Sequence, residues 1–191
     1  MILPRPFLMI RHGQSEANLA ELCSGHMDVA LTALGRDQAR TAGKIIAGLP
    51  EALRPRRIVH SHLQRARDTA ALINESLGGL PISETPDIAE QYFGKWEGMP
   101  WQDAFPRLKN KEDPEGGETH LIFRERAKKA VQEIVGASED MPLIVSHGGV
   151  FHAFTALYDQ EIGPVMNCAP YRFSPRDHAY SWEIAAITAS A

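Results

Sequence analysis

Three short, continuously apolar runs constrain the fold of this chain more than any other feature. They span residues 7–10, 58–59 and 143–145, and each is followed directly by a polar pair that contains a histidine. Unbroken rather than alternating apolarity is typical of strands in a parallel sheet that is covered on both faces. The runs therefore predict three buried strands whose carboxyl ends carry polar side chains.

Amphipathic helices are predicted between these strands, because apolar residues recur there at spacings of three and four. The three stripes consist of Ala39, Ala42, Ile46 and Leu49; of Leu63, Ala66, Ala70, Ile73 and Leu77; and of Phe123, Ala127, Ala130 and Ile134. Thr32 is the expected N-cap of the first helix. Strands that alternate with helices predict an α/β fold, here a three-layer α/β/α sandwich with a mainly parallel central sheet. A late strand is expected over residues 182–187.

Length and composition favour a single domain that spans residues 1–191, with no internal break. The net charge of −4 offers no basic field for nucleic acid, and no apolar run approaches the roughly 20 residues that cross a bilayer. No signal peptide is recognised at the N-terminus, so a cytoplasmic protein without membrane contact is expected. The two cysteines, Cys23 and Cys168, form no CxxC pair and are expected to be reduced.

Residues 94–119 differ from the rest of the chain. They are rich in glycine, proline and charge, and they include Trp96 and Trp101. Irregular segments near the carboxyl ends of strands commonly carry binding residues, so we expect a partly helical excursion that covers the site. Trp96, Trp101 and the preceding Tyr92 either line the substrate pocket or belong to the core.

His12 follows the first apolar run and lies between Arg11 and Gly13. A glycine lets a phosphate approach the backbone closely, and an arginine presents a planar fork of N–H donors that matches phosphate oxygens. Taken alone, the tripeptide is more typical of a loop with a surface histidine.

The other two strand ends add residues to the same candidate site. Arg65 falls in the first turn of a helix expected to begin near Ser61, where free backbone N–H groups attract anions. His147 precedes Gly148 and Gly149, which open another predicted helix. Separately, Arg65 could be a solvated arginine and His147 a buried helix cap. Ligands of open α/β sheets bind beyond the carboxyl ends of the strands, so together these residues predict an anion site.

Two other kinds of site are disfavoured. The glycines after His147 lack the lysine and the spacing of a Walker loop, so a nucleoside triphosphate is not expected. The eight histidines form no HExxH pattern, and carboxylates do not flank them at spacings typical of zinc sites. We therefore expect no metal and no other cofactor.

In their order along the chain, these motifs resemble the histidine phosphatase superfamily, which includes the cofactor-dependent phosphoglycerate mutases and many small phosphatases. Residues 11–18 resemble its RHG(E/Q)(S/T)xxN signature, although Gln14 stands where an acidic residue is commoner. Further matches cover residues 24–28, 31–32, 35–39, 61–66, 90–98, 117–118 and 146–149. The resemblance extends over nearly the whole chain and implies a phosphoglycerate mutase-like fold.

The resemblance also implies a role for each candidate residue. His12 would accept the phosphoryl group and Glu90 would protonate the leaving oxygen, while Glu97 competes for that role but is expected to shape a loop. Arg11, Asn18, Arg65 and His147 would hold the phosphoryl oxygens, with Ser24, Gly25 and Gly148 as further phosphate or substrate contacts. Such a donor array suits in-line phosphoryl transfer without a metal. Arg11 and Arg65 are expected to lower the pKa of His12, which must attack as neutral imidazole.

Three classes of function follow from this resemblance. The short chain and the Phe-Gly-Lys-Trp-Glu-Gly stretch at residues 93–98 are similar to small phosphatases, so a phosphatase acting on a small-molecule phosphate ester is preferred. The alternatives are a mutase-type phosphoryl transfer and a non-catalytic phosphate-binding module. Residues 94–119 and the segment around residues 167–173 are expected to shape the pocket for the leaving group.

Overall fold

A computed structural model of the chain describes residues 5–158, 160, 162–176 and 181–188. Its centre is a six-stranded sheet of order β3-β2-β4-β1-β5-β6. The parallel strands are β1 (Phe7–Arg11), β2 (Arg57–Ser61), β3 (Ile82–Thr85) and β4 (Pro142–Ser146). An antiparallel hairpin of β5 (Pro170–Pro175) and β6 (Trp182–Ala186) completes the sheet next to β1. The predicted mainly parallel sheet is confirmed, and the late strand begins where expected and ends one residue earlier.

The unbroken apolarity of β1 is explained by two separate cores, one on each face of the sheet. Phe7 and Met9 belong to one hydrophobic cluster, whereas Leu8 and Ile10 belong to the other. Successive strand residues point to opposite faces, so a strand between two helical layers needs apolar residues at every position.

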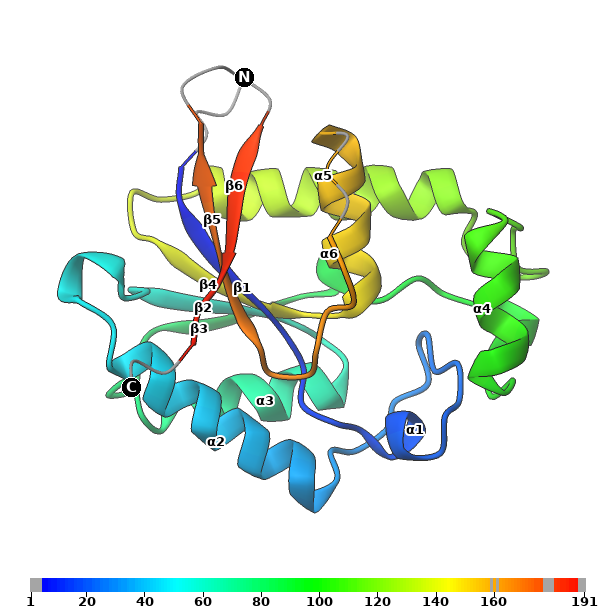
Figure 1. Cartoon of the computed structure of the whole chain (residues 1–191), viewed down its shortest axis with the longest axis horizontal. Coiled ribbons are helices and arrows are strands. Elements are labelled where there is room, and N and C mark those ends of the chain that lie inside the picture. Colours follow the sequence, from blue (N-terminus) through cyan, green and yellow to red (C-terminus); the bar gives the residue numbers. More distant parts are fainter. Residues whose placement is uncertain (1–4, 159, 161, 177–180, 189–191) are drawn as a thin grey trace.

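Helices cover both faces of the sheet (Figure 1). α2 (Ala33–Ala47) and α3 (Gln64–Asn74) pack on one face, and α5 (His120–Gly136) and α6 (Gly148–Thr155) pack on the other. Thr32 caps α2 as expected by accepting a hydrogen bond from the Gly35 amide. The predicted helices are longer than the observed ones. Leu63 is the N-cap of α3, and Leu49 and Leu77 lie beyond the last turns of α2 and α3. The three-layer sandwich is confirmed.

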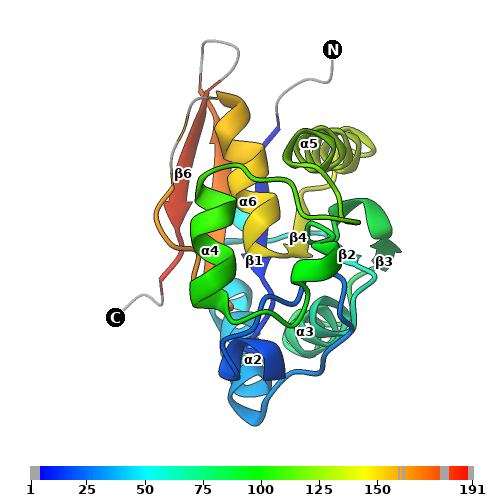
Figure 2. The ribbon, with the colours of Figure 1, turned by 90° about the vertical axis from the view of Figure 1, so that its right-hand side faces the viewer.

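The excursion at residues 94–119 contains the 3₁₀ turn η3 (Gly94–Trp96) and helix α4 (Trp101–Lys109). In Figure 1, α4 lies to the right, beyond the carboxyl ends of the parallel strands, and Figure 2 views the molecule from that side. Trp96 is only 6% exposed and packs with Cys23, Phe93 and Ala104, so it is a core aromatic residue rather than a pocket residue. Tyr92 and Trp101 are exposed.

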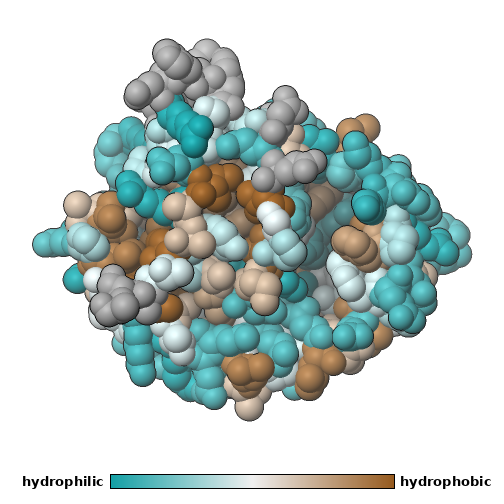
Figure 3. All heavy atoms as spheres, in the orientation of Figure 1, coloured by the Kyte–Doolittle hydropathy of each residue, from teal (hydrophilic) through white to brown (hydrophobic). Residues whose placement is uncertain are grey.

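The remaining short helices are α1 (Glu16–Leu19) and the 3₁₀ turns η1 (Glu51–Leu53), η2 (Pro86–Ile88) and η4 (Ala156–Tyr158). On the face shown in Figure 3, apolar surface gathers over the β5–β6 hairpin, and the surface over α4 is largely hydrophilic. None of the helices in the described part of the chain has the length and apolarity needed to cross a bilayer.

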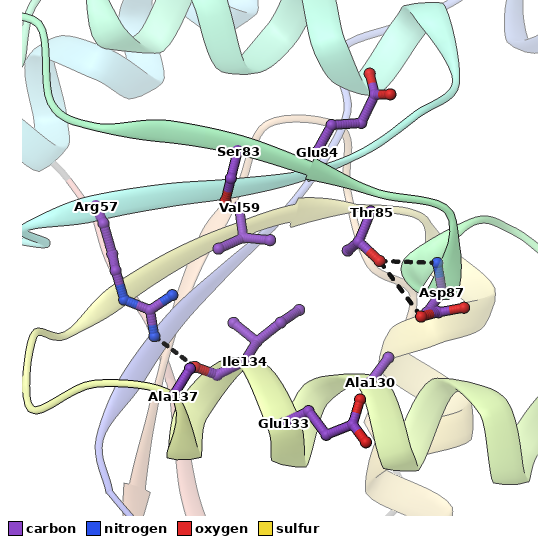
Figure 4. Close-up of a pocket in the computed structure, with 10 residues that line it drawn as sticks. All are labelled: Arg57, Val59, Ser83, Glu84, Thr85, Asp87, Ala130, Glu133, Ile134 and Ala137. Atoms are coloured by element: carbon purple, nitrogen blue, oxygen red, sulfur yellow. Dashed lines mark hydrogen bonds between the residues drawn. The ribbon is translucent and has the colours of Figure 1, made fainter.

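A cavity of about 240 Å³ lies between β2, β3 and α5 (Figure 4). Its lining includes Arg57 together with the carboxylates Glu84, Asp87 and Glu133. The Arg57 guanidinium is already engaged, because it donates to the carbonyl oxygen of Ile134. None of the residues expected to bind phosphate lines this cavity.

Candidate active site

The carboxyl ends of β1, β2 and β4 bring His12, Arg65 and His147 together. All three side chains are buried, with exposures of 4%, 1% and 0%. The two imidazole rings lie 5.1 Å apart between centroids, and Nε of Arg65 donates to Nε2 of His12 over 3.3 Å. The His12 amide also donates to the carbonyl of Ser146 at 2.9 Å, which extends the pairing of β1 and β4 into the site.

The tautomer of His12 follows from its hydrogen bonds. Nδ1 lies 2.7 Å from the carbonyl oxygen of Gly13, and a carbonyl can only accept, so Nδ1 must carry the proton. Nε2 is then unprotonated, and its lone pair, which accepts from Nε of Arg65 in this structure, is the one that a nucleophile requires. Burial is the largest cause that lowers the pKa of His12 well below 6.5, and the cations Arg65 and Arg11 lower it further. The imidazole is therefore neutral at pH 7.

Arg65 is held by the turn that follows α1. Its Nη2 and Nη1 donate to the carbonyls of Gly25 and Met27, at 2.7 and 2.9 Å. Burial lowers the pKa of Arg65 to about 10, so it remains a cation at neutral pH. Ser24 contributes through its carbonyl, which accepts from the Met27 amide at 2.6 Å. Gly25 has φ of +42°, and a Cβ there would lie 2.3 Å from a carboxylate oxygen of Glu97. The turn thus holds Arg65 through backbone oxygens.

Two buried nitrogens of the site have no hydrogen-bond partner in the part of the chain that the structure describes. They are Nε of Arg11 and Nδ1 of His147. Nη1 of Arg11 donates to the carbonyl of Val165 at 2.8 Å, and Nε2 of His147 lies 2.8 Å from Oγ of Ser61. Burial lowers the pKa of both side chains, and Arg65 lowers that of His147 further. Buried polar atoms without partners are rare in proteins, and two beside one histidine are typical of a site that binds a polar ligand.

The carboxylate of Glu90 docks onto the start of α6. Its two oxygens accept from the amides of Gln91 at 2.9 Å and Gly149 at 3.0 Å. The Glu90 carboxylate can lie this close to the backbone of α6 only at a glycine, because a Cβ on Gly149 would lie 2.0 Å from Oε1 of Glu90. The neighbouring Gly148 has room for a Cβ, 3.8 Å from Cδ of Arg11. Glu97 instead accepts from the amides of His26 and Phe93 and so joins two loops.

Asn18 lies in α1, where it forms a capping box with Ser15. Its Oδ1 accepts from the Ser15 amide at 3.1 Å and from Nδ2 of Asn167 at 3.3 Å. Asn167 Nδ2 also lies 2.7 Å from the His12 carbonyl and donates to it. Because its oxygen is engaged on the protein side, the Asn18 amide group is oriented with its N–H₂ available as a donor.

Sequence reasoning missed several residues that support the site. Thr69, one turn after Arg65, accepts from the Gly13 amide at 3.0 Å and donates to the Arg65 carbonyl at 2.7 Å. Arg126 pairs with Glu118 through two hydrogen bonds of 2.7 and 2.8 Å. It also donates to the carbonyls of Asp87, Ala89 and Glu90. The position of Glu118 in the ordered motifs was the available signal for this pair, and nothing in the sequence marks Arg126. The segment that begins at Asn167 was expected to shape the leaving-group pocket, but the contact of Asn167 with His12 was not predicted.

The next groups to consider are the side chains that could bind a metal, including the two cysteines. Among the residues that the structure describes, no three histidine, cysteine, aspartate or glutamate side chains form a group that could hold a metal ion. The cysteines are free and buried, and burial raises the pKa of each thiol to about 12. Neither is therefore a thiolate at neutral pH.

Comparisons with known proteins agree with this chemistry. A family model described as the histidine phosphatase superfamily (branch 1) matches residues 7–165. The chain is 35% identical over 169 residues to a glucosyl-3-phosphoglycerate phosphatase of Mycolicibacterium vanbaalenii, covering 80% of this chain and 73% of the relative. It is 33% identical to an adenosylcobalamin/alpha-ribazole phosphatase of Salmonella typhimurium, covering 78% and 76% of the two chains.

Solved structures are similar over nearly the full length. A mycobacterial glucosyl-3-phosphoglycerate phosphatase, described as a complex with VO3, superposes with a TM-score of 0.78 at 25% identity, covering 96% of this chain and 98% of the other. An alpha-ribazole phosphatase from Shigella flexneri has a TM-score of 0.79 at 24% identity, with 95% of both chains covered, and supports the fold.

Proposed function

The chain belongs to branch 1 of the histidine phosphatase superfamily and is a small-molecule phosphatase, and from this premise we propose that Nε2 of His12 carries the phosphoryl group during hydrolysis of a phosphate monoester. The observation that carries the proposal is the state of His12. Its Nδ1–H is committed to the Gly13 carbonyl, its Nε2 is unprotonated and accepts from Nε of Arg65, and its pKa is depressed. Such an imidazole is a nucleophile at neutral pH.

In the first step, the Nε2 lone pair of His12 attacks phosphorus and the bond from phosphorus to the ester oxygen breaks. Negative charge on the three equatorial oxygens would be held by Arg11, Arg65, His147 and Asn18. The unpartnered Nε of Arg11 and Nδ1 of His147 support this assignment. Glu90, whose carboxyl group is fixed by two backbone amides, would give its proton to the departing oxygen.

In the second step, water attacks the phosphohistidine. Glu90, now a carboxylate, takes a proton from that water as its oxygen bonds to phosphorus. The bond between phosphorus and Nε2 breaks, the electron pair returns to the imidazole, and inorganic phosphate forms. His12 is again neutral and Glu90 again protonated, so the cycle closes.

The matched relatives named above are phosphatases, which supports hydrolysis rather than mutase-type transfer. A small phosphate ester with a carbohydrate-like or ribosyl leaving group is the proposed substrate class. We propose that one domain performs the reaction and that residues 94–119, which hold α4, cover the leaving group. The proposed location is the cytoplasm, supported by two buried cysteines that are free thiols. Ser24, Gly25 and Gly148 are proposed to contact phosphate through their backbone N–H groups.

A panel of phosphate monoesters tests this function through release of inorganic phosphate. The wild type should hydrolyse several of them, and His12→Asn should lose about 10³-fold or more of kcat. His120→Asn is the matched control, because His120 begins α5 and takes no part in the phosphate site. Phosphate release by His12→Asn at the wild-type rate would contradict the proposal.

A further inference from the structure

Ser61 ends β2 as a fully buried side chain next to His147. We propose that Ser61 is a positioning residue, whose hydroxyl donates to Nε2 of His147 and so places the proton of that imidazole on Nδ1. The proposal rests on the proposed function, because Nδ1–H would then donate to a phosphoryl oxygen.

The hydrogen bonds around Ser61 determine the direction of donation. Oγ of Ser61 accepts from the Leu63 amide at 3.3 Å and lies 2.8 Å from Nε2 of His147. Within the described part of the chain, these are the hydrogen-bond partners of Oγ. An amide N–H can only donate, so Nε2 is the acceptor that remains for the hydroxyl proton.

The opposite arrangement leaves two buried groups unsatisfied. If Nε2–H of His147 donated to Ser61, Oγ would accept twice and its own proton would have no acceptor. Nδ1 of His147, which has no partner, would then be a bare acceptor facing a site that contains Arg11 and Arg65 but no donor bonded to it. With donation from Ser61, every atom of the pair is satisfied except Nδ1–H. Leaving a buried polar atom unpaired costs about 1–3 kcal/mol, so the arrangement with fewer such atoms is preferred.

A donor at Nδ1 suits the proposed chemistry. The His147 ring lies 5.1 Å from the His12 ring, within reach of a phosphoryl group attached to Nε2 of His12. An ionised phosphoryl oxygen can only accept, and it repels a nitrogen lone pair. Ser61 would therefore make neutral His147 a hydrogen-bond donor without requiring that the ring be protonated.

Nuclear magnetic resonance of the resting enzyme reads the tautomer directly. Long-range ¹H–¹⁵N correlation of the uniformly labelled full chain distinguishes protonated from unprotonated ring nitrogens, and the His147 signals are those lost in His147→Gln. The wild type should carry the proton on Nδ1. Ser61→Ala should populate the Nε2–H tautomer, and Ser61→Thr, which keeps the hydroxyl, should restore the wild-type signals.

Kinetics should follow the tautomer. Ser61→Ala is expected to lower kcat by about 10- to 100-fold and to weaken inhibition by orthovanadate by a similar factor. This loss is smaller than the one expected when a hydrogen-bond donor to the transition state is itself removed. Thr155→Val is the control: its hydroxyl is also buried, but it donates to the Phe151 carbonyl within α6 and not to a residue of the phosphate site. It should change kcat by no more than about twofold, because its hydroxyl does not act on His147.

Circular dichroism would show whether the variants fold. If Ser61→Ala does not, Ser61→Thr and Ser61→Val repeat the comparison with side chains of nearly equal shape, with and without the hydroxyl. A wild-type His147 protonated on Nε2, or a hydroxyl-free variant with wild-type tautomer and kcat, would overturn the proposal. Because the tautomer is measured without substrate, this failure is distinct from a failure to form phosphohistidine on His12.

Discussion

Burial and two arginines act on His12 in the same direction. Both favour the neutral imidazole, and the Gly13 carbonyl then fixes which nitrogen keeps the proton. The sequence predicted the effect of Arg11 and Arg65, because the three residues occur in recognisable motifs. It did not predict that burial lowers the pKa of His12 more than the arginines do. How deeply His12 is buried depends on segments far away in sequence, including the loop that contains Asn167.

Glu90→Ala should reduce activity more for esters with a poor leaving group than for esters with a good one. Without a proton donor, an alkoxide must depart unprotonated, so kcat for a sugar phosphate should fall by about 10²- to 10⁴-fold. p-Nitrophenyl phosphate has a good leaving group and should lose far less in the step that forms phosphohistidine. Single-turnover kinetics with both esters measure the two losses, and Glu84→Ala, in the distant cavity, is the control. Equal losses for both esters would contradict an acid role.

At the scale of the elements, the site exists because parallel strands end at one edge of the sheet. The apolar runs were sufficient to predict β1, β2 and β4, although the order of strands in the sheet could not be read from them. Helix ends were predicted less well. Leu49 and Leu77 lie outside the helices but pack against the core, and Leu63 is buried as the N-cap of α3, so all three extend the apolar stripes.

Arg126 shows how α5 holds the segment that carries Glu90. The Arg126 and Glu118 side chains are only 21% and 13% exposed, and Arg126 also donates to the backbone carbonyls of residues 87, 89 and 90. Arg126→Leu should lower the free energy of unfolding by about 1.5–3 kcal/mol, since a charged, partly buried hydrogen-bond network is broken. It should also lower kcat for sugar phosphates by about 10-fold, because Glu90 remains present but is less well positioned. This loss is smaller than the one expected for Glu90→Ala.

Arg124→Leu is the matched control on the same helix. Its guanidinium makes an exposed hydrogen bond to the Ala156 carbonyl and does not contact the Glu90 segment. Urea denaturation and steady-state kinetics on both variants test the prediction. Indistinguishable stability and kcat for the two variants would show that α5 does not position Glu90.

At the scale of the whole molecule, the buried neutral histidines couple folding to pH. The pKa values of His12 and His147 are depressed in the folded state, whereas the unfolded chain binds protons near pH 6.5. The unfolded state therefore gains protons first as the pH falls. Each histidine contributes stability that is complete above about pH 6.5 and is lost below it, by up to about 1.4 kcal/mol per pH unit.

Urea denaturation at pH 7.5, 6.5 and 5.5 measures this coupling. The wild type should lose stability between pH 6.5 and 5.5, and His147→Gln should lose less by about 1 kcal/mol, the contribution of one titrating group. His120→Gln is the comparison, because burial lowers the pKa of the partly exposed His120 less than that of the buried His147, so the slope should change less. The same pH dependence in wild type and His147→Gln would contradict the assignment.

Rapid quenching with a ³²P-labelled monoester measures whether His12 carries the phosphoryl group. The wild type, quenched in alkali within the first turnover, should hold label on His12 that survives base and is released by acid, as a phosphoramidate requires. His12→Asn should hold none. Hydrolysis that proceeds with no acid-labile label on the wild type at any quench time, or at an undiminished rate in His12→Asn, would show that His12 does not carry the phosphoryl group.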